Sequence, residues 1–505
     1  MLSECLASGQ HLGESSSLED PPFTISRSDV LGRFLEASRD IRAGQLVLRE
    51  SPCAVGPQPG APFTCIGCLR RIAAPFCKCP MCSVAPFCSV QCTNGQMHSD
   101  RECGALRRRI RGRACVTLQP QTVLPLRCFL LQWTLPDKWK ALMELEGHEE
   151  ERQGTAVWQS VDAGVVAVLL GMGIITPEDR DTLQRICSIL DVNSFEVRGP
   201  EGEPLRAIYP TAALLAHDCT PSAFLGHEPE DMSLVIRAAI DLKKGDLITH
   251  NYAGTLLPSI ERRDNLRKGK YFECRCRRCA DPFELGTNLG SLRCCGCGVG
   301  PVVPKDPMDR HSDWKCDRCG RVVSGALAEA TYFVARGLLE RSDRGDEEVM
   351  ELLLQKLSES FYPGHALLLE VGQILAGLYN EHSAEWMMSP RPNYALIRRW
   401  RLCEGLLKTL NKLEPGISRM KGVCMYEMAV CMTTLAAKGR ETATIKAKDV
   451  SSILRQSECL LKQSVANLLF EPQGSPEQKL IYSAFRALRR VKELLHGEKE
   501  TLHRI

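Results

Sequence analysis

The clearest hydrophobic pattern in this chain is a helical one in its C-terminal part. From about residue 327 onward, apolar residues recur at intervals of three and four, as an amphipathic helix requires. Three such stripes are Leu367, Leu368, Val371, Ile374, Leu375 and Leu378; Leu402, Leu406, Leu410 and Leu413; and Ile481, Phe485, Leu488 and Leu495. We find no repeat of fixed period, so a stacked array of the tetratricopeptide kind and a plain helical bundle both stay open. Either could wall one side of a cleft or hold a partner peptide.

The N-terminal half instead shows short apolar runs on both sides of a helical block. Runs typical of strands cover 41–48, 234–238 and 247–249, with more short strands expected over 21–56 and after 193. The pattern from 124 to 190 is mainly helical, and Thr176-Pro177 supplies an N-cap followed by a proline at the first helical position. A further basic helix is predicted over 260–272.

Length, composition and charge narrow the class of protein. A chain of 505 residues predicts roughly three or more domains, and 44% hydrophobic residues can bury substantial cores. The net charge of +3 favours neither nucleic acid nor an anionic membrane as a partner. No run of about 18 apolar residues predicts a membrane span. Residues 1–20 are rich in Ser and Glu and are expected to form a disordered tail without a secretory signal.

The 26 cysteines predict metal sites. Without a signal peptide we expect a reducing compartment, where cysteines in C-x2-C pairs indicate zinc rather than disulfides. Eight ligands in the first cluster suit two tetrahedral zinc sites, with Cys77 as an alternative ligand. They are Cys65, Cys68, Cys79, Cys82, Cys88, Cys92, His98 and Cys103. The segment has little apolar content, so the metal is expected to stabilise its fold.

Two more cysteine clusters follow. Two C-x2-C knuckles predict a zinc ribbon, with Cys295 as a bystander. Their cysteines are Cys294, Cys297, Cys316 and Cys319. Before them, residues 211–279 contain a His-x-Cys turn, a tyrosine after an apolar strand and a C-x-C-x2-C cluster. This order predicts a zinc-clipped active site.

A basic run lies after the first cluster, over 107–113. Arginines of this kind can bind phosphates. No aromatic residues alternate with them for base stacking, so we favour a solvated helix face or an interdomain contact.

In order and content, these segments resemble the SMYD family, the SET and MYND domain-containing protein-lysine methyltransferases. The ribbon and residues 414–419 resemble the family's divergent arthropod branch. The resemblance implies an α+β fold: a SET domain of small β-sheets, split by a MYND zinc finger, with a post-SET zinc site, an additional zinc ribbon and a helical, tetratricopeptide-like C-terminal domain. The implied segments are 21–62 (SET N-terminal part), 63–103 (MYND), 104–190 (helical insertion), 191–256 (SET core), 257–283 (post-SET), 290–323 (ribbon) and 325–505 (helical domain).

The resemblance also implies roles for individual residues. Tyr252 matches the catalytic tyrosine. The implied S-adenosylmethionine-binding residues are Gly32, Arg33, Asn193, Ala216, His217, Tyr271 and Phe272. The implied post-SET zinc ligands are Cys219, Cys274, Cys276 and Cys279. With the finger and the ribbon, these ligands predict about four structural zinc ions.

The implied activity is transfer of a methyl group to a lysine of a histone or non-histone protein, in transcriptional regulation and chromatin. The lysine amine, whose pKa is about 10.4 when free, must lose its proton, and an apolar channel favours that loss. Catalysis would then be chiefly positioning of amine, methyl and sulfur. We expect a monomer in nucleus and cytoplasm, without membrane or nucleic-acid partners. The alternative is a weak or inactive scaffold or corepressor whose MYND finger binds proline-rich peptides.

Four positions depart from the family pattern. Phe34 would crowd the methionine end of the cofactor unless the loop shifts, and Ala216 lacks the side-chain hydrogen bond of the usual asparagine. Ser222 replaces a second asparagine. Lys270 stands where a channel tyrosine is usual, which would put a cation beside the sulfonium. A slip of one residue, placing Tyr271 in the channel, would remove that difficulty.

Overall fold

The computed structural model describes residues 20–94, 98, 100–109, 117–381 and 392–502. Two sequence predictions fall largely outside these ranges. Of the predicted tail, only Asp20 is described, and the arginine run is described only as far as Arg109. Arg107 and Arg108 are exposed on α2 (Asp100–Arg109), as a solvated helix face requires.

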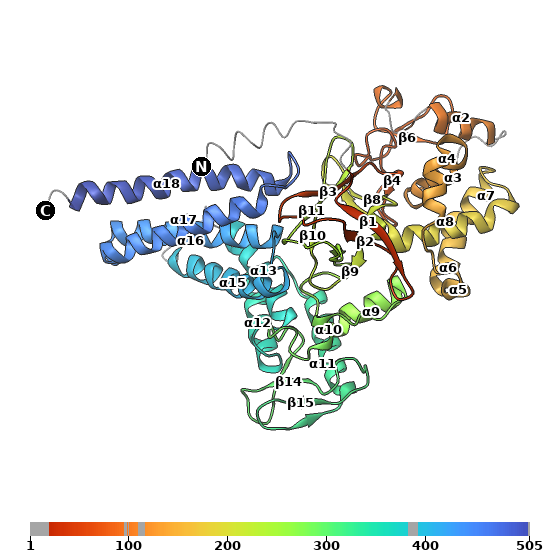
Figure 1. Cartoon of the computed structure of the whole chain (residues 1–505). Coiled ribbons are helices and arrows are strands. Elements are labelled where there is room, and N and C mark those ends of the chain that lie inside the picture. The colour runs from red at the N-terminus through yellow and green to blue at the C-terminus, as the bar shows by residue number, and fades with distance from the viewer. Residues whose placement is uncertain (1–19, 95–97, 99, 110–116, 382–391, 503–505) are drawn as a thin grey trace.

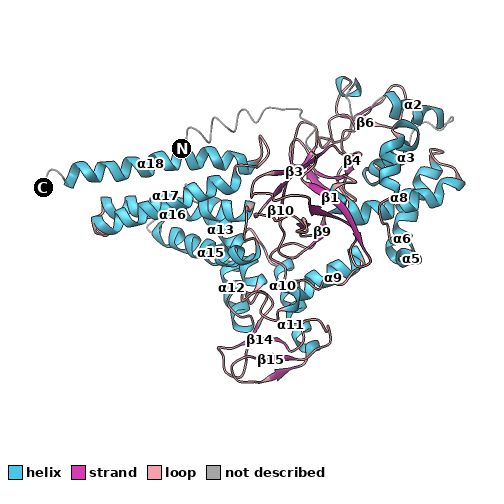
Figure 2. Cartoon of the chain, viewed as in Figure 1, coloured by secondary structure: helices cyan, strands magenta, loops and turns pink. Residues whose placement is uncertain are grey.

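Small β-sheets lie in the centre of the molecule, between two helical regions (Figure 1, Figure 2). The central strands are β1 (Phe23–Ser28), β2 (Gly32–Ala37), β3 (Leu46–Glu50), β4 (Ala54–Pro57), β7 (Phe195–Arg198), β8 (Pro204–Ile208), β9 (Ala216–His217), β10 (Ala223–His227), β11 (Leu234–Ala238) and β12 (Thr249–His250). The sheet orders are β1-β2, β10-β11-β3, β4-β8-β7 and β12-β9.

Two segments far apart in sequence share these sheets. β3 pairs with β11, so that Leu48 lies opposite Ile236, and β4 pairs with β8, so that Ala54 lies opposite Ile208. Side chains alternate between the faces of a strand, and one face supplies a common core. Its members, each at most 3% exposed, include Leu35, Val47, Leu205, Ala207, Leu234, Ile236 and Ala238. One core therefore joins the strands on both sides of the insertion.

The insertion separates β4 from β7 and is mostly helical. It contains β5 (Cys77–Lys78), β6 (Pro86–Phe87), η1 (Gln91–Asn94), α2, α3 (Pro120–Thr134), α4 (Pro136–Met143), α5 (Glu149–Arg152), α6 (Ala156–Val161), the π-helical segment η2 (Asp162–Val166), α7 (Ala167–Gly171), η3 (Pro177–Asp179) and α8 (Arg180–Asn193). The helix start predicted at Thr176 is confirmed, because its backbone N–H donates to Asp179 Oδ2 at 2.9 Å in a capping box.

After β12 the chain becomes helical, except for one small sheet. The elements are α9 (Ser259–Lys270), α10 (Arg277–Ala280), β13 (Leu292–Arg293), β14 (Pro301–Pro304), β15 (Trp314–Cys316), β16 (Val322–Val323), α11 (Gly325–Arg341), α12 (Glu347–Ser360), α13 (Ala366–Glu381), α15 (Pro392–Leu413), α16 (Arg419–Glu441), α17 (Ala447–Leu468) and α18 (Pro476–Leu502). β13 to β16 form an antiparallel sheet in chain order.

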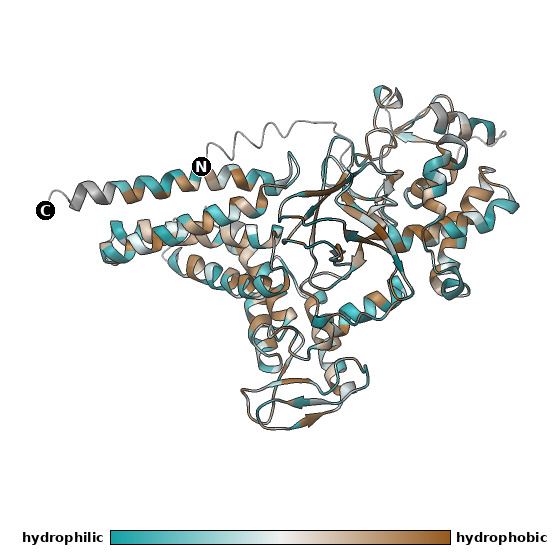
Figure 3. Cartoon of the chain, in the orientation of Figure 1, coloured by the Kyte–Doolittle hydropathy of each residue, from teal (hydrophilic) through white to brown (hydrophobic). Residues whose placement is uncertain are grey.

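The long C-terminal helices form a stacked array. From α12 to α18, each described helix packs against the next one along the chain. The predicted stripe on α13 is buried, with Leu367, Val371 and Leu375 at 0% exposure. Brown and teal residues alternate along these helices, as amphipathic helices require (Figure 3). None of the described helices is both long and apolar enough to cross a bilayer.

The loop between α15 and α16 joins this array to the central strands. The N–H of Ile417 donates to the carbonyl of Ala239 at 2.9 Å, and Thr255 Oγ1 donates to Glu414 Oε1 at 2.5 Å. Gly416 lies so close to Ala239 that any Cβ at this position would collide with its carbonyl oxygen. The close approach explains why this turn carries a glycine.

Gly416→Ala is expected to destabilise the protein by about 1–3 kcal/mol, because the added methyl has no room at the joint. Gly405→Ala is the matched control: Gly405 lies within α15 with open space around its Cβ position, so alanine should be neutral or stabilising there. Thermal unfolding and limited proteolysis would measure both changes. Equal stability of the two variants would contradict the close packing of Gly416 against Ala239.

Candidate functional site

A cleft of about 2120 Å³ opens between the central strands, residues 144–148 of the insertion and residues 471–477, which lead into the first turn of α18. It collects residues that the sequence predicted to act together, although they come from distant segments. The predicted site residues that line it are Gly32, Arg33, Asn193, Ala216, His217, Tyr252 and Phe272. The cleft is therefore the candidate active site.

A short parallel pairing brings His217 and Tyr252 together. β9 lies beside β12, with His217 opposite His250. The backbone N–H of Tyr252 then donates to His217 Nδ1 at 3.1 Å, and His217 Nε2 lies 3.3 Å from Cys219 Sγ. With Nδ1 accepting a hydrogen bond, the proton of the neutral ring is on Nε2 and faces the sulfur. Burial lowers the pKa of His217 to about 4, so this neutral form holds at physiological pH.

Tyr252 presents a protonated phenol in an aromatic environment. Its hydroxyl donates to the carbonyl of Leu215, and burial raises its pKa. Phe272 meets its ring edge-on at 6.5 Å, and the ring of His217 lies 5.1 Å away. The phenol is thus fixed as a neutral hydrogen-bonding group.

The insertion fixes two further residues of the cleft wall. Arg33 Nη2 donates to the carbonyl of Glu144 at 2.7 Å. Asn193 Nδ2 donates to the carbonyls of Glu146, at 2.7 Å, and Ile189, at 2.9 Å. The segment around 144–146 therefore sets the positions of Arg33 and Asn193, which a sequence motif alone does not reveal.

The proposed slip at Lys270 and Tyr271 does not occur. Tyr271 ends α9 with a positive φ of 59°. Its ring packs against His148 at 4.9 Å, its hydroxyl accepts a hydrogen bond from Arg152 at 3.4 Å, and it is not among the residues lining the cleft. Lys270 lines the cleft instead, with Nζ 5.6 Å from the centre of the Tyr252 ring. The prediction that placed Tyr271 in the channel is wrong about its position.

The other departures have simpler outcomes. Phe34 is 9% exposed and does not line the cleft, so the expected crowding is absent. Ser222 forms a hydrogen bond to the adjacent strand β12: its Oγ accepts from the N–H of Thr249 at 2.9 Å. Ala216 lines the cleft and shows only a methyl group there.

Sequence reasoning missed several polar residues of the cleft. His250 and His227 both line it, and burial lowers the pKa of each to about 4. At the opposite wall, Arg419 Nε donates to Glu471 Oε1 at 2.8 Å. His250 stands two residues before Tyr252 in the sequence, and this proximity was the available signal. Arg419 and Glu471 gave none, because only the packing of the helical array brings them here.

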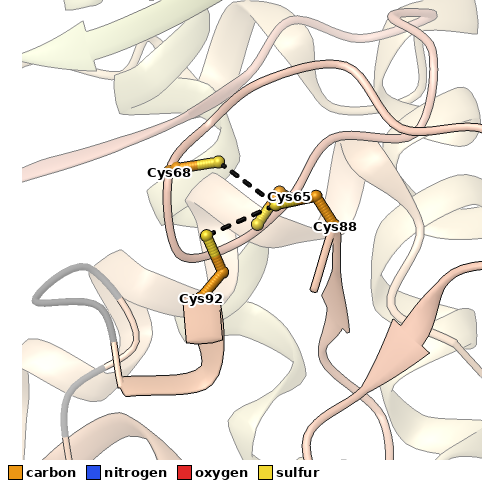
Figure 4. A group of neighbouring side chains, drawn as sticks. All are labelled: Cys65, Cys68, Cys88 and Cys92. Carbon is orange, nitrogen blue, oxygen red and sulfur yellow. Dashed lines mark hydrogen bonds between the residues drawn. The ribbon is translucent and has the colours of Figure 1, made fainter. Parts of the chain in front are cut away.

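All predicted metal ligands converge in four groups. Within each group the ligand atoms lie within 4.8 Å of one another. The groups are Cys65, Cys68, Cys88 and Cys92; Cys79, Cys82, His98 and Cys103; Cys219, Cys274, Cys276 and Cys279; and Cys294, Cys297, Cys316 and Cys319. Figure 4 shows the first group, with its sulfurs turned toward one another. Four thiolate or imidazole donors fit a closed, structural zinc site. Cys77 and Cys295 are in none of these groups.

Arg127 on α3 connects the second of these groups to β4. His98 Nδ1 lies 2.9 Å from Glu102 Oε1, a carboxylate that orients the ring so that Nε2 faces the neighbouring cysteines. Arg127 donates to Glu102 at 3.1 Å and also to the carbonyls of Val55, at 2.7 Å, and Ile66, at 2.9 Å. One buried guanidinium thus links the finger, β4 and α3.

Buried charges surround the post-SET group. Arg262 and Arg278 are 0% exposed, and Glu284 is 3% exposed. Arg262 Nε lies 3.3 Å from Cys219 Sγ, and Arg262 Nη1 lies 2.6 Å from Glu284 Oε2. Two cations and one carboxylate leave a net positive charge beside four thiolates, which offsets the negative charge that a zinc tetrathiolate carries.

Comparison with known proteins decides the family. The SET domain-containing protein SmydA-8, isoform A, of Drosophila melanogaster is 30% identical over 372 residues, which cover 70% of this chain and 77% of the fly protein. The chain belongs to the SMYD family. The predicted architecture is therefore confirmed: an α+β SET fold with several Cys/His zinc-binding clusters and a helical C-terminal region.

Other relatives match smaller parts of the chain. Histone-lysine N-methyltransferase ASHR1 of Arabidopsis thaliana is 25% identical, covering 60% of this chain and 65% of its own length. Histone-lysine N-methyltransferase SMYD3 of Homo sapiens is 26% identical, covering 49% and 59%. No family model matches. The SET domain of LSMT bound to lysine and AdoHcy aligns with 12% identity and a TM-score of 0.26, a likeness that carries no structural argument.

Metal analysis of the purified SMYD chain should find about four zinc ions, one for each ligand group. Two or fewer would mean that a whole cluster was wrongly assigned. Cys219→Ser should lower the count by about one, because a tetrahedral site with three thiolates holds zinc more weakly.

Arg262→Met should destabilise the SMYD chain by about 3–5 kcal/mol, because it breaks a buried ion pair and leaves Glu284 and the thiolates with one cation fewer. It should also speed zinc release to a chelator. Arg267→Met on the same helix removes a half-exposed pair with Asp264 and should cost at most about 1 kcal/mol. Thermal unfolding and a chelator assay test both variants, and identical curves would contradict the role of Arg262.

Proposed function

We propose that this protein is an S-adenosylmethionine-dependent protein-lysine methyltransferase that acts on a histone or non-histone protein in transcriptional regulation. The observation that carries the proposal is the contact of His217 with the backbone of Tyr252 in a cleft that is also lined by Gly32, Arg33, Asn193, Ala216 and Phe272. Relatives over the same region are named histone-lysine and N-lysine methyltransferases. We propose a nuclear and cytoplasmic monomer with a protein substrate.

The residues that line the cleft can accommodate S-adenosylmethionine, except that Lys270 is a cation. Phe272 and Tyr252 offer aromatic surface in the cleft, and Gly32, with a φ of +66°, leaves open space where a side chain would stand. When bound, S-adenosylmethionine supplies a methyl group on a sulfonium. Tyr252 would orient the incoming amine, and the buried walls would favour the neutral form of that amine over its ammonium. The four cysteines from Cys219 to Cys279 would hold the segment that carries Phe272.

A second candidate function is a SET/MYND scaffold or corepressor whose finger binds proline-rich peptides. The observation in its favour is Lys270 in the cleft, because a cation there opposes a sulfonium ligand. In this case the SET domain would have weak or no activity.

The test is binding followed by transfer. Calorimetry should detect S-adenosylmethionine binding. A failure to bind at any reachable concentration would rule out the methyltransferase and favour the scaffold function. Radiolabelled methyl transfer to a nuclear extract should fall by about 100-fold in Tyr252→Phe, the loss expected when a reacting group is no longer positioned. Tyr482→Phe, an exposed tyrosine on α18, is the matched control. Equal labelling by both variants would remove Tyr252 from the mechanism.

A further inference from the structure

The last residue of α9 places a lysine in the wall of the cleft. Lys270 Nζ donates to the carbonyl of Val192, which precedes Asn193 at the end of α8. The same ammonium lies 5.6 Å from the centre of the Tyr252 ring. Lys270 therefore touches both the segment that carries Asn193 and the face of Tyr252.

The charge of Lys270 has no paired carboxylate. In the part of the chain that the structure describes, no Asp or Glu lies within 4.0 Å of its ammonium. Burial lowers the pKa of Lys270, and the carboxylate that opposes this effect is Asp191, which is already paired with Arg152 at 2.5 Å and Arg206 at 3.1 Å. His250, a titratable ring near Lys270, is half-buried, and burial lowers its pKa to about 4. This wall of the cleft thus carries an uncompensated positive charge.

An aromatic face attracts a cation, and here the protein supplies that cation itself. Two like charges repel each other more strongly in a partly buried site than in water, because the effective dielectric constant is lower. A ligand with a positive centre near Tyr252 would therefore bind less well than a neutral ligand of the same shape.

We propose that Lys270 makes this site discriminate by charge, so that it binds the neutral thioether S-adenosylhomocysteine more tightly than the sulfonium S-adenosylmethionine. This rests on the proposed function, and it names Lys270 as a specificity-determining residue. The methylated product would leave behind the cofactor form that the site prefers. S-adenosylhomocysteine would then compete effectively with S-adenosylmethionine for the site.

Calorimetry with the full chain and both ligands tests the proposal. In the wild type, S-adenosylhomocysteine should bind at least about tenfold more tightly than S-adenosylmethionine, a difference of about 1.4 kcal/mol. Lys270→Met should strengthen S-adenosylmethionine binding about tenfold and change S-adenosylhomocysteine binding less than about twofold. Lys270→Arg keeps the charge and should retain the wild-type preference.

Lys268→Met is the matched control, since Lys268 lies on the same helix, is exposed and pairs with Asp264. It should leave both affinities unchanged. If Lys270→Met changes the affinities for both ligands by the same factor, or changes neither affinity, the charge proposal is overturned while the proposed function stands. If neither ligand binds wild type or variants, the proposed function fails and this proposal fails with it.

Discussion

The arrangement of the cleft depends on one short parallel pairing, that of β9 with β12. It places the imidazole of His217 between the backbone of Tyr252 on one side and the sulfur of Cys219 on the other. The tyrosine, the histidine and the post-SET cysteines are therefore parts of one connected structure. A change in the cysteine group would reach the phenol through a single ring, which makes the metal site part of the geometry of the cleft.

Around this contact, the molecule is assembled from segments that are distant in sequence. The insertion fixes Arg33 and Asn193 through the carbonyls of 144 and 146. The helical array supplies the opposite wall, and Gly416 lets the two regions approach within backbone contact. The cleft thus belongs to no single segment, and its shape depends on how three regions pack.

The sequence was most informative where spacing alone determines geometry. Two cysteines with two residues between them can both reach one ion, so the ligands of the finger and of the ribbon could be predicted from their spacing. The post-SET ligands, with Cys219 far from the other three, were predicted only from the family resemblance. The amphipathic stripes predicted the helical array for the same local reason. By contrast, Tyr271 could not be placed, because the positive φ that ends α9 decides which of two neighbouring side chains turns inward. Arg419 and Glu471 could not be found at all, because they reach the cleft only through tertiary packing.

Arg127 has a consequence for how the zinc finger would act. Because this guanidinium holds Val55, Ile66 and Glu102 at once, the finger is not a tethered module that can swing. Because the finger, α3 and β4 share this one buried side chain, any displacement of the finger relative to β4 would break hydrogen bonds that have no water to replace them.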